Sequence, residues 1–368
     1  MNYHFFKGNV LHLSPSIMEG ILKNANETNG GGIKEHFFYI SLFDSKMLYN
    51  YRDSSYEKMF ASYGFTKFEY IKSKVRFIYI LLSLKSGDNV FFHGCPSPYY
   101  LQLLLYIIMI VFGLKRKAKS MSMICWGESD FYYSRHGVIS MCVQYIYGLI
   151  FPKLKSLITI SPGDTALAKK LYPNASIIEA PYFSDREIVY SQVEKDELTI
   201  MVSHSGWPHN NHIQSFNLLS KFSKNNIRVI CPLCYGDKEY INYVVEKGKS
   251  IFGDKFSYFT DLKSKDEYID FLRTVDIYIT SASIQTGLFA LMTIITSGGK
   301  VFLTGNLLYS MNQYGFVVED LNKIGEYSFN ELSQKITKEE YNLNISVYVS
   351  KYSNLKDLQQ KWKNIYSN

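Results

Sequence analysis

The stretch DIYITSASIQTGLFALMTIITSGGKVFLTG, residues 276–305, decides the fold class of this chain. It holds two short β-type runs, Ile277–Thr280 and Lys300–Leu303, and an apolar run between them, Gly287–Thr296, that ends at a pair of glycines. A strand, a loop, a helix and a second strand in this order favour a parallel sheet with a covering helix. The stretch therefore predicts an α/β fold.

The loop of this unit is the first candidate for a binding site. It follows the carboxyl end of a strand and precedes a helix, where free backbone N–H groups and the helix dipole attract phosphate oxygens. Gln285 offers a neutral amide to a hydroxyl or a base edge, and Gly287 lets a ligand approach the backbone closely. An ordinary strand–helix unit with a capped helix has the same pattern, so this stretch alone does not establish a site.

The totals of the whole chain fit a protein of two domains. With 368 residues, 46% of them hydrophobic, the chain is long enough for two sizeable cores. Its net charge of +7 is modest and diffuse, which suits an anionic small ligand or an anionic membrane surface. The sequence holds no nucleic-acid-binding pattern, and no nucleic-acid partner is expected.

Strands alternate with helices along the chain, which predicts doubly wound parallel sheets in two Rossmann-like halves with a cleft between them. A polar and charged stretch, residues 181–197, is the expected linker, and residues 54–86 are expected to be mostly helical. The expected divisions are an N-terminal Rossmann-like domain, a C-terminal Rossmann-like domain, and a final helix that packs back toward the N-terminal domain: residues 1–185, 196–345 and 346–368.

The most apolar stretch, Leu101–Leu114, is followed at once by a basic cluster, so that Leu101–Lys119 combines an apolar face with positive charge. As a helix the apolar part is about 21 Å long, which is less than the roughly 30 Å of a bilayer core. We expect the segment to lie on an anionic membrane surface rather than to cross it. A helix buried against the sheet is an alternative that is compatible with partial membrane contact.

Two further features predict a cytoplasmic protein at the inner face of the cell membrane. The N-terminus, MNYHFFKGNVLHLSPS, lacks the basic region and long apolar core of a signal peptide. The five cysteines are odd in number and mostly lie in apolar surroundings, which is typical of free thiols in a reducing compartment.

Four loops at the ends of predicted strands could carry chemistry. They are Phe92–Gly94, Trp126–Tyr132, Ser203–His212 and the opening loop with Gln285 and Gly287. The sequence contains no GxSxG, HExxH, Walker A or GxGxxG motif and no strand-end DxD pair. A hydrolase triad and a metal-dependent phosphoryl transferase are therefore poorly supported, and no metal or cofactor is expected.

Five segments of the chain, most of them at these loops, resemble one known family. In order, FFHG (91–94), WGESDFY (126–132), SPGDTALAKKLYP (161–173), VSHSGWPHNNHI (202–213) and SIQTG (283–287) are similar to segments of the bacterial 4-acetamido-4,6-dideoxygalactose transferases of enterobacterial common antigen synthesis. The resemblance runs from about residue 88 to 315. The chain departs from the family by an extra residue between Gly127 and Asp130, and by His204–Trp207, where the family usually has Asn-Ser-Gly-Asp.

This resemblance implies a GT-B fold, in which two Rossmann-like domains face an interdomain cleft. It implies an inverting, metal-independent transfer of a dideoxy-acetamido hexose from a nucleotide-diphosphate sugar, dTDP-linked in the family, to a lipid-linked glycan in surface-polysaccharide or O-antigen-like synthesis. Residues 1–185 would then hold the acceptor and residues 196–345 the nucleotide sugar.

The loops of the second half suit the donor, because a metal-free transfer needs N–H groups, hydroxyls or cations to stabilise the departing diphosphate. The predicted donor-binding residues are Ser205 and Gly206 near the diphosphate, Asn210 and Tyr235 toward the nucleoside, and Gln285, Thr286 and Gly287 at the helix start. Turn formation and helix capping explain several of these residues equally well.

The first half should supply the base that accepts the proton of the acceptor hydroxyl. Asp130 is favoured because it matches the Asp of the family, and Glu128 and His93 are the next candidates. Gly94, Trp126 and Gly127 complete the predicted acceptor side. A role in loop solvation or helix capping is the structural alternative for the carboxylates.

Two other functions remain open from the sequence. A sugar-nucleotide epimerase or hydrolase would change the nucleotide sugar without an acceptor. A non-catalytic nucleotide-sugar- or glycan-binding protein would bind the ligand without turnover.

Overall fold

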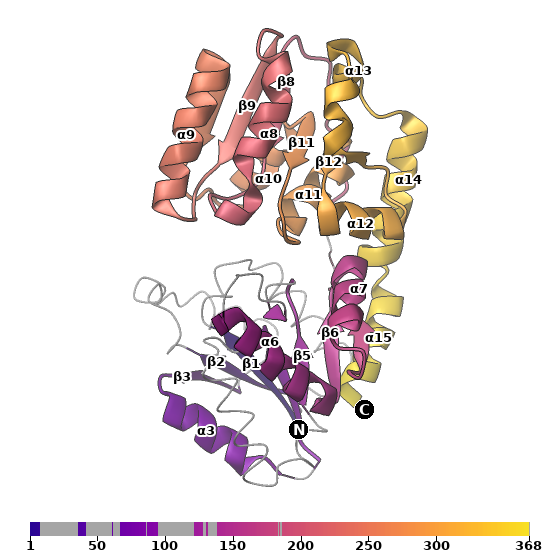
Figure 1. Cartoon of the computed structure of the whole chain (residues 1–368). Coiled ribbons are helices and arrows are strands. Elements are labelled where there is room, and N and C mark those ends of the chain that lie inside the picture. Colours follow the sequence, from indigo (N-terminus) through magenta and orange to yellow (C-terminus); the bar gives the residue numbers. More distant parts are fainter. Residues whose placement is uncertain are drawn as a thin grey trace. The chain divides into compact units, whose positions relative to one another are not determined.

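The computed structural model describes residues 1–7, 36–41, 61, 67–85, 87–94, 121–127, 130–131, 138–182, 184 and 186–367. The chain forms two units, of which the first holds both ends of the sequence. Unit 1 comprises Met1–Ser184 and Asn354–Asn368, and unit 2 comprises Asp185–Ser353. Each unit is built on its own parallel sheet with helices around it (Figure 1).

The described strands of unit 1 form a seven-stranded sheet in the order β3-β2-β1-β4-β5-β6-β7. All neighbouring strands run parallel. The strands are β1 (Asn2–Lys7), β2 (His36–Ser41), β3 (Phe68–Ile71), β4 (Asn89–His93), β5 (Met121–Ile124), β6 (Ser156–Thr159) and β7 (Ile177–Glu179).

Helices cover both faces of this sheet, so its central strands contribute apolar residues to both faces. Successive residues of a strand point to opposite faces. Accordingly Val90 and Phe92 join one core with helices α3 and α6, while Phe91 between them joins a second core with the C-terminal helix α15. The described helices of unit 1 are α3 (Lys74–Ser83), α6 (Val138–Ile150), α7 (Pro162–Leu171) and α15 (Leu355–Ser367), with a 3₁₀ turn at Phe151–Lys153.

The helix α15 is held by a buried tryptophan. Trp362 lies in the second core, stacks on Tyr182 at a ring distance of 5.1 Å, and donates from Nε1 to the carbonyl oxygen of Pro181 at 3.0 Å. The last residues of the chain thereby complete the core of the unit that the first residues begin.

Unit 2 has a six-stranded parallel sheet in the order β10-β9-β8-β11-β12-β13. Its strands are β8 (Leu198–Val202), β9 (Ile227–Pro232), β10 (Phe256–Phe259), β11 (Ile277–Thr280), β12 (Lys300–Leu303) and β13 (Glu319–Asp320). Its helices are α8 (His212–Leu219), α9 (Lys238–Phe252), α10 (Lys265–Arg273), α11 (Leu288–Thr296), α12 (Gly305–Tyr314), α13 (Phe329–Ser333) and α14 (Lys338–Tyr348). Shorter helical turns are Pro208–Asn210, Ser220–Phe222, Gly253–Lys255, Leu321–Glu326 and Val349–Ser353.

Residues 276–305 have the predicted form, with β11, α11 and β12 as strand, helix and parallel strand. Both sheets confirm the predicted α/β class. The expectation for residues 54–86 is wrong in part, because β3 pairs with β2 at the edge of the sheet before α3 begins.

Each sheet reverses its strand order once. The reversal lies between β1 and β4 in unit 1 and between β8 and β11 in unit 2. In open α/β sheets, ligands bind at the carboxyl ends of the strands beside such a reversal.

Candidate functional site

The reversal point of unit 2 begins with an unusual backbone at the end of β8. Ser203 has a φ of 56°, in the left-handed region that residues other than glycine rarely adopt. Its N–H donates to the carbonyl oxygen of Ile279 at 2.8 Å, and its hydroxyl lies 3.2 Å from Thr280 Oγ1. These contacts fix the turn after β8 to the end of β11, so that the following residue is directed toward the loop after β11.

Three of the predicted donor-binding residues contact one another in the loops after β8 and β9. The fully buried Asn210 donates from Nδ2 to the carbonyl oxygen of Ser205 at 2.7 Å and to Ser205 Oγ at 2.8 Å. The Tyr235 hydroxyl also hydrogen-bonds the side chain of Ser205, and burial raises the pKa of Tyr235. Ser205 therefore connects Asn210 and Tyr235, as a site that holds one ligand would require.

Gly206 has a structural role that the sequence did not indicate. Its N–H donates to the carbonyl oxygen of Tyr235 at 2.8 Å, and its own carbonyl accepts from Asp237 N at 3.1 Å. A Cβ at Gly206 would lie 2.2 Å from Ile241 Cγ1, and one at Gly236 would lie 2.3 Å from the backbone of Gly206. The close approach of the two loops therefore requires glycine at position 236, and the packing of α9 against the first loop favours glycine at position 206.

The loop after β11 places a buried amide beside the start of α11. Gln285 is 5% exposed, and within the described part of the chain neither Nε2 nor Oε1 has a hydrogen-bond partner. Gly287 is the N-cap residue of α11 with a φ of 71°, and no side chain caps this helix end. The predicted residues Gln285, Thr286 and Gly287 thus form the start of a helix with unused hydrogen-bonding capacity.

The structure adds His204 to this group, a residue that the sequence reasoning missed. Its Nε2 lies 3.1 Å from Thr286 Oγ1 and 3.3 Å from Ser205 Oγ, which joins the loops after β8 and β11. Burial lowers the pKa of His204 to about 3, with smaller contributions from His209 and His212. Its position directly after the β8 turn, at the point where the strand order reverses, is the signal that could have identified it.

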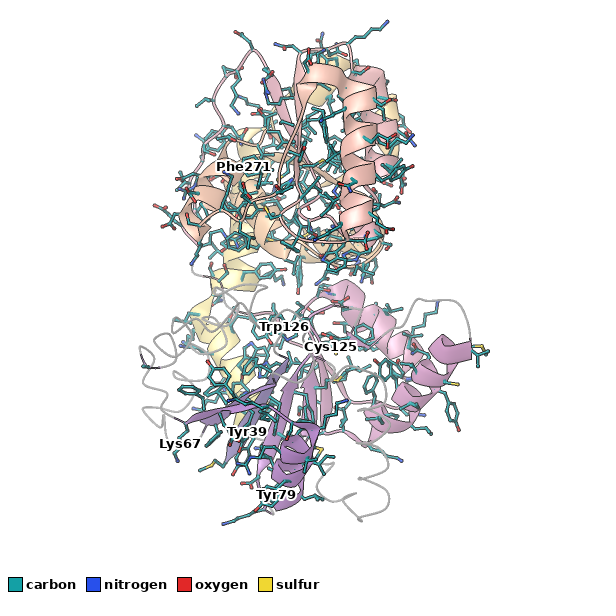
Figure 2. The ribbon with its side chains drawn as sticks, turned by 90° about the vertical axis from the view of Figure 1, so that its left-hand side faces the viewer. Tyr39, Lys67, Tyr79, Cys125, Trp126 and Phe271 are labelled. Carbon is teal, nitrogen blue, oxygen red and sulfur yellow. The ribbon has the colours of Figure 1, made fainter. Side chains whose placement is uncertain are left out.

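On unit 1, the structure brings three predicted residues together in the turn after β5. Asp130 is 7% exposed, and its Oδ2 accepts from the backbone N–H of Trp126 at 2.8 Å. The N–H of Asp130 donates to the carbonyl oxygen of Gly127 at 3.1 Å. The Asp130 carboxylate therefore organises this turn, whatever else it does. Figure 2 shows Trp126 just beyond the strand ends, far from Tyr79 of α3.

The predicted residue His93 lies at the end of β4 and is fully buried. Its Nε2 lies 2.9 Å from Nδ1 of His4, and its ring stacks on Phe6 at 4.1 Å. Burial lowers the pKa of His93 to about 3, so that the ring is neutral at neutral pH. Gly94, with a φ of 82°, follows it and donates its N–H to the carbonyl oxygen of Ile124 at 2.8 Å.

Other predictions fall partly or wholly outside the described residues. Glu128 and the segment Leu101–Lys119 lie outside them. Within the described ranges, no group of three or more His, Cys, Asp or Glu side chains is arranged to hold a metal ion. In the same ranges, no helix has both the length and the apolar character needed to cross a bilayer.

Comparison with known proteins identifies what this arrangement resembles. The sequence model of a family described as 4-alpha-L-fucosyltransferase, glycosyl transferase group 56, matches residues 80–312, which is well over half of the chain.

Solved structures of glycosyltransferases are similar over the whole length. HepE from Anabaena, in complex with UDP and glucose, has a TM-score of 0.68 at 8% identity, with 100% of both chains covered. WaaG, a glycosyltransferase of lipopolysaccharide biosynthesis, has a TM-score of 0.60 at 12% identity, also with 100% of both chains covered. The outer core galactosyltransferase WaaB has a TM-score of 0.61 at 11% identity and covers 100% of this chain and 99% of its own. At these identities the likeness concerns the fold, and it confirms the predicted GT-B class.

Proposed function

Because the chain belongs to the 4-alpha-L-fucosyltransferase family, glycosyl transferase group 56, and is therefore a glycosyltransferase, we propose that it acts on a dTDP-linked sugar. The proposed reaction moves a dideoxy-acetamido hexose to a lipid-linked glycan, with inversion at the anomeric carbon and without a metal ion. The product would enter surface-polysaccharide assembly of the O-antigen-like or common-antigen-like kind.

The observation that carries this proposal is the buried amide of Gln285. In the part of the chain that the structure describes, its two polar atoms have no partner although the side chain is 5% exposed. An unsatisfied buried polar group costs about 1–3 kcal/mol, which a ligand with both donors and acceptors would recover. Sugars and nucleobases are such ligands. The adjoining start of α11 favours phosphate oxygens, and a nucleotide-diphosphate sugar combines all these groups.

A cation also lies near the start of α11. The guanidinium of Arg186 stacks over the ring of Phe289, in the first turn of α11, at 4.5 Å. Displacement of the sugar leaves negative charge on the departing diphosphate, which N–H groups, hydroxyls and cations can stabilise in place of a metal. Arg186, Thr286 and Ser205 are the groups we assign to this role.

The attacking hydroxyl of the acceptor must lose a proton as its oxygen bonds to the anomeric carbon and the bond to the diphosphate breaks. Asp130 is the proposed base. The Trp126 N–H holds its Oδ2 in a fixed position at 2.8 Å, so that the carboxylate is oriented before the acceptor arrives. His93 is less suited to this role because it is fully buried, and Glu128 is the other candidate.

Membrane contact is part of the proposal because the acceptor is lipid-linked. Helix α6 has no charged residue, and yet Val138, Met141 and Tyr145 are 76%, 73% and 69% exposed. Their spacing places them on one side of the helix. An exposed apolar surface of this kind supports contact with a membrane, in addition to the predicted segment Leu101–Lys119. The proposed location is the inner face of the cell membrane.

The test of this function is transfer from dTDP-, UDP- and GDP-sugars to a polyprenyl-diphosphate glycan, followed by mass spectrometry, for the wild type and Asp130→Asn. We expect transfer from the dTDP-sugar alone, and a loss of at least about a hundredfold in the variant. The amide oxygen that replaces the carboxylate in the variant would still accept from the Trp126 N–H, so calorimetric binding of dTDP and the melting temperature should change little. Unchanged turnover in the variant rejects Asp130 as the base, and turnover without an acceptor rejects the transferase.

A further inference from the structure

We infer that His204 binds the diphosphate of the donor through Nδ1–H, as a neutral hydrogen-bond donor, an assignment that rests on the proposed function. Four observations support the assignment: the placement of the ring, the partners of Nε2, the surroundings of Nδ1 and the charge of the ring.

The ring is placed by the turn at the end of β8. The left-handed backbone of Ser203, bonded to Ile279 and Thr280 of β11, brings His204 against the loop after β11. The contact between His204 Nε2 and Thr286 Oγ1 at 3.1 Å is direct evidence of this approach. His204 therefore occupies the reversal point of the sheet, where a bound ligand is expected.

Two hydroxyls converge on Nε2, and both can donate to it, which favours hydrogen on the other ring nitrogen. Ser205 Oγ, 3.3 Å from Nε2, accepts from Asn210 Nδ2 at 2.8 Å and also hydrogen-bonds the Tyr235 hydroxyl. When Tyr235 donates in that bond, the Ser205 hydrogen is left to donate to Nε2. Thr286 Oγ1 can also donate. A neutral imidazole that accepts at Nε2 carries its hydrogen on Nδ1. This tautomer offers a donor to an oxygen that can only accept, as phosphate oxygens do.

In the described part of the free protein, the hydrogen-bonding capacity of Nδ1 is unused. Among the residues that the structure describes, this buried nitrogen has no hydrogen-bond partner. A Cβ at Gly287 would lie 2.6 Å from it, so Nδ1 faces the bare Cα at the start of α11. Independently of this ring, the buried and unsatisfied amide of Gln285 lies two residues before Gly287. The helix start thus has two unsatisfied polar side chains beside its own N–H groups, a combination that suits an anion.

The charge of the ring is consistent with a neutral donor. Burial lowers the pKa of His204 to about 3, so the imidazole is uncharged at neutral pH. It can therefore stay buried in the free protein without a counter-ion and still donate one hydrogen bond when the diphosphate binds.

The test replaces His204 with two amide side chains, Asn and Gln, that differ in length by one methylene group. In His204→Asn the amide nitrogen can occupy the position of Nδ1, whereas in His204→Gln it reaches the position of Nε2. Calorimetry with dTDP should show a roughly tenfold to hundredfold loss of affinity in His204→Gln, the expected effect of a lost hydrogen bond to a charged group. His204→Asn should stay within about threefold of the wild type. Melting temperatures show whether both variants are folded.

Several outcomes would overturn the assignment. Wild-type affinity of His204→Gln for dTDP rejects it, and so does an equal loss in both variants. A loss that appears with the dTDP-sugar and not with dTDP places the ring on the sugar instead. If the wild type binds UDP or GDP in place of dTDP, the same comparison is made with that nucleotide. If the wild type binds none of dTDP, UDP and GDP, both the proposed function and this inference are rejected. If the wild type binds one of them and only the variants give the wrong result, the inference alone is rejected.

The tautomer gives a readout that does not depend on affinity. Imidazole nitrogen signals in ¹⁵N-labelled protein, assigned by their absence from His204→Asn, should show hydrogen on Nδ1 in the complex with dTDP. Hydrogen on Nε2 in that complex would overturn the inference.

Discussion

At the scale of single residues, the reversal point of unit 2 contains buried polar atoms that have no hydrogen-bond partner among the described residues. Asn210 Oδ1, His204 Nδ1 and both amide atoms of Gln285 are without partners in the described chain. Each such atom lowers the stability of the free protein by about 1–3 kcal/mol. A ligand that satisfies them should therefore stabilise the fold as well as bind to it.

The first prediction at this scale concerns Gln285→Ala. The change removes an unsatisfied buried amide, so the melting temperature of the free protein should be equal to or higher than that of the wild type. Binding of the dTDP-sugar should weaken by roughly tenfold, because the ligand loses hydrogen bonds. Thermal unfolding with and without ligand measures both effects. An unaltered donor affinity would reject the role of Gln285.

The position of His204 after a strand end was visible in the sequence, but its contacts were not. Its capacity as a donor depends on Gly287, Thr286 and Ser205, of which the first two lie 83 and 82 positions later in the chain. No spacing rule relates residues at this distance. Ser205 and Gln285 were proposed from the sequence because they lie in loops that follow a strand end or precede a helix start.

At the scale of elements, helix α6 permits a test of membrane contact. The double variant Met141→Glu with Tyr145→Glu places two negative charges on its exposed apolar side. We expect binding to anionic lipid vesicles to fall by roughly tenfold or more, because charge replaces apolar area that would be buried in the interface. Co-sedimentation with vesicles of phosphatidylglycerol measures this binding.

The matched control is Tyr243→Glu on α9, where an exposed tyrosine is also replaced by a carboxylate. This variant should bind the vesicles nearly as the wild type does. Full vesicle binding by the α6 double variant would contradict the assignment of α6 to the membrane. Equal losses in the two variants would indicate that added negative charge alone explains the effect.

The elements also show what the sequence predicts and where prediction fails. The strands Ile277–Thr280 and Lys300–Leu303 were predicted with their correct bounds, because both of their faces are buried and their apolar runs are bounded by turn residues. The edge strand β3 was missed within an expected helix, because it is only four residues long and depends on pairing with β2. Tertiary pairing outweighs local preference in such a strand.

Helices α13 and α14 were missed although the sequence carries their start signals. Ser328 with Glu331, and Thr337 with Glu340, form capping boxes in the structure. The same Ser-x-x-Glu pattern starts α10, where Ser264 and Glu267 also form a capping box. The capping signals were therefore present in the sequence. They were not used because α13 is short and α14 is only weakly amphipathic, so neither shows a clear helical pattern after its cap.

At the scale of the whole molecule, buried neutral histidines predict sensitivity to acid. Burial lowers the pKa values of His93, His204 and His212 to about 3. The unfolded chain binds protons at these groups near pH 6.5, and the folded chain does not. The stability that they contribute is therefore complete above pH 6.5 and is lost as the pH falls toward 3.

We expect the free energy of unfolding to fall between pH 6.5 and 5 by roughly 1 kcal/mol per pH unit for each such histidine. Urea unfolding at a series of pH values measures this slope. In His212→Gln the free energy of unfolding should change less steeply with pH, by the contribution of one histidine. This difference in slope does not depend on the absolute stability of the variant. A stability that stays constant from pH 7.5 to 5 would contradict the burial of these rings.

The path of the chain also determines the order in which the protein can be completed during synthesis. Unit 2 is continuous in sequence, so it can fold as soon as its last helix leaves the ribosome. Unit 1 starts earlier and finishes last, since Trp362 and its neighbours on α15 cover the second face of its sheet. The nascent protein therefore carries an uncovered apolar sheet through the whole synthesis of unit 2. A chain that stops shortly before Trp362 would leave this surface open permanently and offer it to chaperones and proteases.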